Sequence, residues 1–169
     1  MDVLTIIKKE HREVGALIDQ ANKCKAGDAR LRELAEEIAT KLSAHLAIEE
    51  RLFYAKLKAR ADEGEEKVDV FEAYTEHTAA RSLMQLLKTH RKPDELFKAE
   101  VQVLGENVKH HVEEEESKVF HIARQLLEAD ELDEIGETWE KAKQRADRVH
   151  SSTAKKRTTR PPSRRASRR

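Results

Sequence analysis

Apolar residues recur at steps of three and four along most of the chain, and no segment alternates between apolar and polar residues for long. This period is typical of amphipathic α-helices, whereas a half-buried strand would show a period of two. Before residue 128 the pattern breaks only around Gly27, Gly64 and Pro93, where glycine and proline favour turns. The sequence therefore predicts an all-α protein with four long helices, over residues 2–24, 29–60, 66–90 and 94–128.

Short connections join these helices, and their length limits how the helices can pack. Asp28 and Asp94 stand where a helix-capping residue or a first-turn acid is expected. Helices joined by a few residues lie antiparallel to their neighbours. We therefore expect residues 1–128 to form an up-down-up-down four-helix bundle.

The pattern changes twice beyond the expected bundle. Leu132, Ile135 and Trp139 share one helical stripe, which predicts a short fifth helix over residues 129–147 that packs on the bundle. Residues 148–169 contain two adjacent prolines, few apolar residues and no acid. A segment of this composition buries too little apolar surface to fold, so we expect a disordered basic tail.

The even charge balance hides two regions of opposite charge. The chain has 33 Lys and Arg and 33 Asp and Glu. Nine of the bases and none of the acids lie in residues 148–169, which leaves residues 1–147 with 24 bases against 33 acids. The basic segment suits contact with nucleic acid or another anionic partner. A terminus that only makes the chain more soluble is the simpler explanation. The acidic helical region gives no support for DNA recognition by a helix.

Several simple features favour a soluble, cytoplasmic protein. No apolar stretch reaches the roughly 18 residues that a membrane span needs, so we expect no membrane contact. The N-terminus lacks the basic region and cleavage pattern of a signal peptide. Cys24 is the only cysteine and has no partner for an intramolecular disulfide. The expected compartment is therefore the cytoplasm.

The eight histidines carry the strongest functional signal. When each predicted bundle helix is laid out on its apolar seam, one histidine falls in each seam. In the second and fourth helices a glutamate follows the histidine four residues later, on the same face. The six seam residues are His11, His45, Glu49, His77, His111 and Glu115.

These seam residues are difficult to explain by packing alone. A single core histidine is usually a packing residue, but a buried carboxylate needs a cation, an ion partner or a proton. Counting from the helix ends places the four histidines within about one helical turn of the same level. Four imidazoles and two carboxylates are too many ligands for one tetrahedral zinc and suit two bridged first-row metal ions. The Glu-x-x-His pair of ferritin-like centres is absent from the sequence.

Four segments resemble the hemerythrin-like HHE cation-binding family, and the resemblance covers residues 1 to about 128. They read EHREVGALID, HLAIEERLFY, YTEHTAARSLMQLL and HHVEEEESKVF. The resemblance implies that the six seam residues bind two iron ions in a non-haem di-iron centre, with Glu49 and Glu115 as bridges. It also implies a small diatomic ligand or peroxide as partner, through O2 binding, sensing of O2, NO or redox state, or peroxide turnover.

Two departures from the family pattern refine these expectations. Oxygen-carrying hemerythrins have a further histidine where this chain has Ala73, so the resemblance implies an open or water-filled coordination position and favours reactivity over simple O2 carriage. The carriers' second carboxylate follows its histidine by five residues, which makes Glu116 a rival to Glu115. The seam and the His45–Glu49 spacing favour Glu115. A non-catalytic iron-binding or redox-signalling module and a purely structural bundle remain the alternatives.

Overall fold

The computed structural model describes residues 1–90 and 92–158, with side chains up to Arg148. Over these ranges the secondary structure is helical without a strand, which confirms the all-α prediction. The elements in chain order are α1 (Val3–Lys23), α2 (Ala29–Glu49), the π-helical turn η1 (Glu50–Tyr54), α3 (Ala55–Arg60), α4 (Glu65–Thr89), α5 (Glu95–Glu114), the π-helical turn η2 (Glu115–Val119), α6 (Phe120–Leu126) and α7 (Ala129–Thr158).

The four predicted helices correspond to four helical runs whose ends lie within two residues of the predicted ones. The second run joins α2, η1 and α3 end to end, and the fourth joins α5, η2 and α6. The two π-helical turns were not predicted. The first begins at Glu50, directly after the predicted ligand Glu49, and the second begins at the predicted ligand Glu115 itself. π-helical turns inside α-helices are often found at functional sites.

Local residues define where two of the runs begin, as the sequence predicted. The Asp28 side chain caps α2 by accepting a hydrogen bond from the Arg30 amide at 2.9 Å. The Asp94 side chain caps α5 by accepting from the Phe97 amide at 3.0 Å. Gly27 has a φ of +88°, a conformation that favours glycine, directly before the first of these caps. These residues separate one helix from the next.

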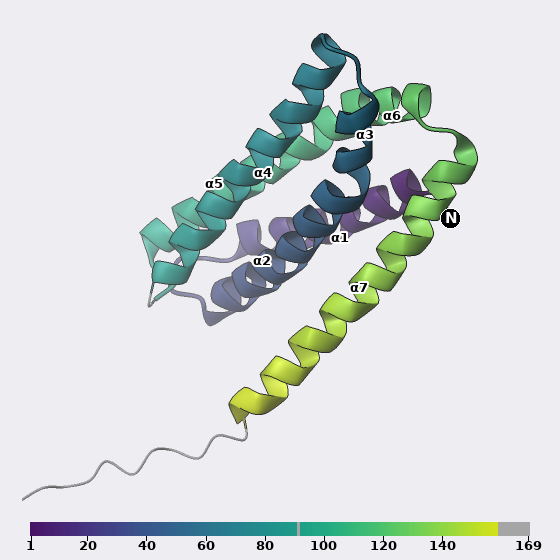
Figure 1. The fold of residues 1–169 in the computed structure, drawn as a ribbon. Coiled ribbons are helices and arrows are strands. Elements are labelled where there is room, and N and C mark those ends of the chain that lie inside the picture. Colours follow the sequence, from purple (N-terminus) through teal and green to yellow (C-terminus); the bar gives the residue numbers. More distant parts are fainter. Residues whose placement is uncertain (91, 159–169) are drawn as a thin grey trace, which may run out of the picture.

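The runs enclose an interior with two apolar clusters. Helix α1 packs against α2 and α5, and α4 packs against α5 and α2; Figure 1 shows the α1–α2 and α4–α5 pairs side by side. One cluster joins the start of α1 to α3, α6 and α7, and the other fills the end of the molecule where α1 meets α2 and α4 meets α5. Among the helices in the described ranges, none combines the length and apolar character that crossing a membrane requires.

The predicted fifth helix exists, but its predicted end was wrong. Helix α7 continues to Thr158, so residues 148–158, which were expected to be disordered, are helical. These residues contain no glycine or proline to stop the helix before Pro161, and alanine, lysine and arginine are good helix formers. Residues 159–169 of the expected tail lie outside the described residues.

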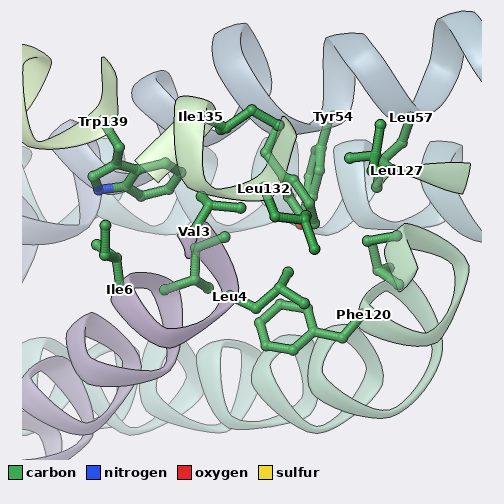
Figure 2. Packing of buried hydrophobic residues seen from close by; sticks show 14 of the residues in the cluster. Val3, Leu4, Ile6, Tyr54, Leu57, Phe120, Leu127, Leu132, Ile135 and Trp139 are labelled. Carbon is green, nitrogen blue, oxygen red and sulfur yellow. The ribbon is translucent and has the colours of Figure 1, made fainter. Parts of the chain in front are cut away.

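Helix α7 is held to the bundle by the stripe that the sequence indicated. Leu132, Ile135 and Trp139 are 8%, 3% and 0% exposed. Figure 2 shows Leu132 and Ile135 next to Val3 and Leu4 of α1. The helix therefore buries its apolar face against the start of α1.

A glycine allows α7 and the N-terminus to approach each other closely. A Cβ atom on Gly136 would lie 2.1 Å from the Met1 carbonyl oxygen and 3.2 Å from the Val3 amide. We expect Gly136→Ala to destabilise the protein by about 1–3 kcal/mol, the usual cost of overpacking. Gly15→Ala in α1, where no atom lies within 4 Å of the added Cβ, is the control and should stabilise it by about 0.5–1 kcal/mol. Urea unfolding measures both, and equal effects would contradict this packing.

Candidate metal centre

The structure brings all six predicted site residues together in one buried layer between the two apolar clusters. His11 comes from α1, His45 and Glu49 from α2, His77 from α4, His111 from α5 and Glu115 from the first position of η2. Their exposed fractions are 7% for His11, 4% for His45 and His111, and 0% for His77, Glu49 and Glu115. The layer is therefore almost completely shielded from water.

Glu49 lies between imidazoles from two helices. Its Oε2 atom is 3.3 Å from Nε2 of His45 and 3.3 Å from Nε2 of His77. The same Nε2 atom of His77 also lies 3.2 Å from Nε2 of His111. Three imidazole nitrogens and one carboxylate oxygen thus face a common space.

Glu115 occupies the corresponding position on the other side of the layer. Its Oε2 atom is 3.2 Å from Nε2 of His11 and 3.7 Å from Nε2 of His111. Its Oε1 atom accepts a hydrogen bond of 2.9 Å from the Tyr54 hydroxyl. The rival Glu116 lies outside the layer, with Oε1 3.0 Å from Nδ1 of His11. The geometry therefore gives the two glutamates different places, with Glu115 facing inwards.

Four further glutamates, which we call the outer carboxylates, contact the outward nitrogens of the four histidines. An ionised carboxylate only accepts hydrogen bonds, so each Nδ1 carries a proton. Nε2 faces inwards as the nitrogen that would bind a metal, the orientation typical of metal-binding histidines. The pairs are His11 Nδ1 with Glu116 at 3.0 Å, His45 Nδ1 with Glu10 at 2.9 Å, His77 Nδ1 with Glu50 at 2.9 Å, and His111 Nδ1 with Glu76 at 2.9 Å.

Each outer carboxylate also contacts a basic side chain. These contacts are Lys8 with Glu116 at 3.5 Å, Lys143 with Glu10 at 2.5 Å, Arg81 with Glu50 at 2.8 Å, and His110 with Glu76 at 3.3 Å. Sequence reasoning missed the roles of Glu10, Glu50 and Glu76. Each of them stands directly beside a seam residue in the chain, and that adjacency is the signal that could have identified them.

Burial and neighbouring charges shift the pKa values of this network strongly. Burial raises the pKa of Glu10, but hydrogen bonds with His45 and Lys143 outweigh it and lower the pKa to about 2. Burial lowers the pKa of His45, but Glu49 and Glu10 raise it to about 10. Burial likewise raises the pKa of Glu49, which His45 and His77 bring well below its usual value. Without a metal, Glu10 and Glu49 are therefore carboxylates on either side of a protonated His45.

The inner atoms fit a metal ion because several of them have no hydrogen-bond partner. Buried polar atoms are nearly always paired, and imidazole nitrogen with carboxylate oxygen is a ligand set that suits first-row transition metals. The unpaired atoms of the layer are Nε2 of His11, Nε2 of His45, both carboxylate oxygens of Glu49 and Oε2 of Glu115. Three overlapping trios have ligand atoms close enough to share an ion: His11, His111 and Glu115; His11, His45 and Glu49; and Glu49, His77 and His111.

The position of Ala73 leaves a small space beside the layer. Ala73 is 3% exposed and lines a pocket of about 10 Å³ together with Glu76 and Glu115. This volume is close to what one water molecule requires. Tyr74, the next residue of α4, is half-buried and donates a 3.2 Å hydrogen bond to the Glu50 carbonyl oxygen.

Comparisons with known proteins bear on the family and the fold. The family model described as the hemerythrin HHE cation binding domain matches residues 2–123. A crystal structure of a hemerythrin HHE cation binding domain-containing protein, the Rv2633c homolog from Mycobacterium kansasii, has a TM-score of 0.74 at 20% identity, over 95% of this chain and 94% of that chain. A DNA nickase from Nostoc sp. strain PCC 7120 is 25% identical over 143 residues, which are 85% of this chain and 39% of that protein. The chain belongs to the hemerythrin HHE cation-binding domain family.

Proposed function

We propose that this chain is a non-haem di-iron protein that binds, senses or reacts with O2, NO or peroxide. One observation carries the proposal: four imidazole Nε2 atoms converge on the buried carboxylates of Glu49 and Glu115. Three of the four carboxylate oxygens lack a hydrogen-bond partner, and an outer carboxylate contacts every Nδ1. When bound, the two irons would supply electrons and a binding position for the small molecule. The ligands that we propose are His11, His45, Glu49, His77, His111 and Glu115.

The protein's own part is to prepare and shield the site. The outer carboxylates fix the tautomers of the four imidazoles. The Tyr54 hydroxyl holds Oε1 of Glu115 at 2.9 Å. Apolar clusters on both sides of the layer exclude water, which strengthens electrostatic interactions inside. From the sequence we also propose that the four helical runs follow an up-down-up-down order and that the protein is cytoplasmic.

The pocket beside Ala73 offers room for a small ligand. We expect Ala73→Val to weaken azide binding to the iron-loaded protein by about five- to hundredfold, because overpacking costs about 1–3 kcal/mol. Ala80→Val is the matched control, since Ala80 is also a buried alanine of α4, 4% exposed, and does not line this pocket. Azide titration followed by absorption measures both variants. An unchanged azide affinity in Ala73→Val, at unchanged iron content, would rule out this entry position.

Metal binding should release protons. The pKa of His45 is raised from 6.5 to about 10 in the metal-free structure, so its imidazole is protonated at neutral pH and must lose a proton to bind metal. Between pH 6.5 and 9 we expect the apparent iron(II) affinity to rise about tenfold per pH unit from this one proton. Competition with a chelator of known pH dependence measures this slope. A flat affinity over that range would refute the expectation.

Peroxide consumption distinguishes the forms of the proposed function. Iron-loaded protein should develop a new near-ultraviolet absorption band on exposure to O2 or peroxide, and His45→Ala should abolish it. Consumption of many peroxide equivalents per chain would indicate an enzyme. Consumption of about one equivalent would indicate sensing or binding and would exclude the peroxidase form. Absence of any spectral response to O2, NO and peroxide would refute the proposal.

A second candidate function is contact with nucleic acid. The nine lysines and arginines of residues 148–169 favour it, and so does the similarity to a relative named as a DNA nickase. The test is a gel shift with labelled duplex DNA, using the full chain and a chain ending at residue 147, at two salt concentrations. Binding that needs the basic segment and weakens with salt would support this function, and binding by neither chain would exclude it.

A further inference from the structure

Helix α7 lies outside the segment that the family model matches, residues 2–123, yet it contacts the candidate metal centre. The fully buried Trp139 donates a hydrogen bond of 3.2 Å from its indole nitrogen to Oε1 of Glu10. Lys143, one turn later, donates to the same oxygen at 2.5 Å. The other oxygen of Glu10 lies 2.9 Å from Nδ1 of His45. Two donors from α7 thus reach a proposed ligand through one carboxylate.

Glu10 differs from the other outer carboxylates in where its partners come from. Glu116, Glu50 and Glu76 contact Lys8, Arg81 and His110, all within residues 2–123. The Glu10 side chain is 8% exposed, against 12% for Glu76, 24% for Glu50 and 29% for Glu116. Glu10 is therefore the most buried of the four and the one whose charge is balanced from α7.

The indole also covers His45 directly. The two ring centroids are 5.5 Å apart at an interplanar angle of 64°. Figure 2 shows Trp139 projecting from α7 towards the bundle, near Ile6 of α1. Lys143 lines a pocket of about 360 Å³ that also borders Glu10 and His45. Side chains of α7 therefore border the same cavity as the Glu10–His45 hydrogen bond.

We propose that Trp139 and Lys143 are positioning residues that act through Glu10 to orient His45 and so determine how tightly one of the two metal ions is held. The proposal rests on the proposed di-iron function. The physical basis is that a carboxylate fixed by two donors accepts from Nδ1 in one geometry, which fixes the imidazole ring and increases its basicity as a ligand. A carboxylate that could move or bind water would hold the imidazole ring less firmly and would increase its basicity less.

The test removes the two donors while keeping an apolar side chain at each position. Trp139→Phe keeps an aromatic ring without the indole N–H, and Lys143→Met keeps the alkyl chain without the charge. Lys141→Met is the matched control, because it removes one charge from α7 at an exposed position, 69% exposed, whose partner is Glu137. Each protein is loaded with iron(II) without oxygen and mixed with an excess of an iron(II) chelator.

The expected result is iron release in two phases. In both donor variants, and most strongly in the double variant, one of the two ions should leave about ten- to hundredfold faster, the usual effect of losing such a partner. The other ion should leave at the wild-type rate, and Lys141→Met should stay within about twofold of wild type. Release from the double variant at the wild-type rate would overturn the proposal, as would equal acceleration of both ions.

A second measurement separates this proposal from the proposed function. Trp139 is the only tryptophan, so its indole N–H gives one assignable NMR signal in metal-free protein. Glu10→Gln should shift that signal, and Glu137→Gln on α7 should not. If wild type binds no iron, the di-iron function fails, while the indole signal still reports whether the contact exists. An indole signal that Glu10→Gln leaves unchanged would refute the contact itself.

Discussion

Replacing Glu49 with glutamine is expected to reduce the bound iron from about two ions per chain to one or fewer. The Glu49 carboxylate is fully buried and contacts both His45 and His77. Glutamine keeps the size of the side chain but removes the charge, and its amide nitrogen offers no ligand lone pair. Iron analysis after anaerobic loading and desalting measures the loss.

Three further glutamate substitutions complete this test. Glu114→Gln should leave the iron content unchanged, because the Glu114 side chain pairs with Lys118. Glu116→Gln should keep both ions but bind one of them about ten- to hundredfold more weakly, as expected for an outer partner of His11. Glu115→Gln should behave like Glu49→Gln. Full iron content in Glu49→Gln would contradict the proposed ligand set, and a greater loss in Glu116→Gln than in Glu115→Gln would reverse the roles of these two residues.

Removal of the metal is expected to lower the free energy of unfolding by about 3–4 kcal/mol when the free ion had been present at 100 to 1,000 times its dissociation constant. Metal that binds the folded state stabilises it, and the metal-free layer keeps buried atoms without hydrogen-bond partners. For a chain of this size, each kcal/mol corresponds to about 2–4 °C in Tm. Thermal unfolding of iron-loaded and chelator-treated protein should therefore differ by about 6–16 °C.

The Glu49→Gln variant provides the control for this prediction. Since it should hold little iron, chelator treatment should change its Tm far less than that of the wild type. The measurement therefore separates metal stabilisation from any direct effect of the chelator. Equal Tm values for iron-loaded and chelator-treated wild type would show that the layer does not couple metal binding to folding.

The helices and the site residues could be predicted because both depend on a helical period. One turn of α-helix separates His45 from Glu49 and His111 from Glu115, so any packing of these seams brings the residues inside. Helix starts at Asp28 and Asp94 were predictable because capping is local. These features require only short-range information.

The remaining features depend on contacts between distant residues. In the sequence, Glu10 looks like a surface acid beside His11. In the structure it contacts Trp139 of α7, which lies 129 residues later in the chain. The π-helical turns at Glu50 and Glu115 change which of the following residues face inwards. The spacing of apolar residues in the sequence does not reveal where such a turn occurs. The end of α7 was misjudged because charge composition does not decide helix length.

The iron content of the protein tests most directly whether the four histidines and two glutamates form a metal centre. Purified chain, loaded with iron(II) without oxygen and desalted, should retain about two iron ions per chain, and Glu49→Gln should retain one or fewer. Wild-type protein that retains no iron above the level of a non-binding control would contradict the proposed metal centre.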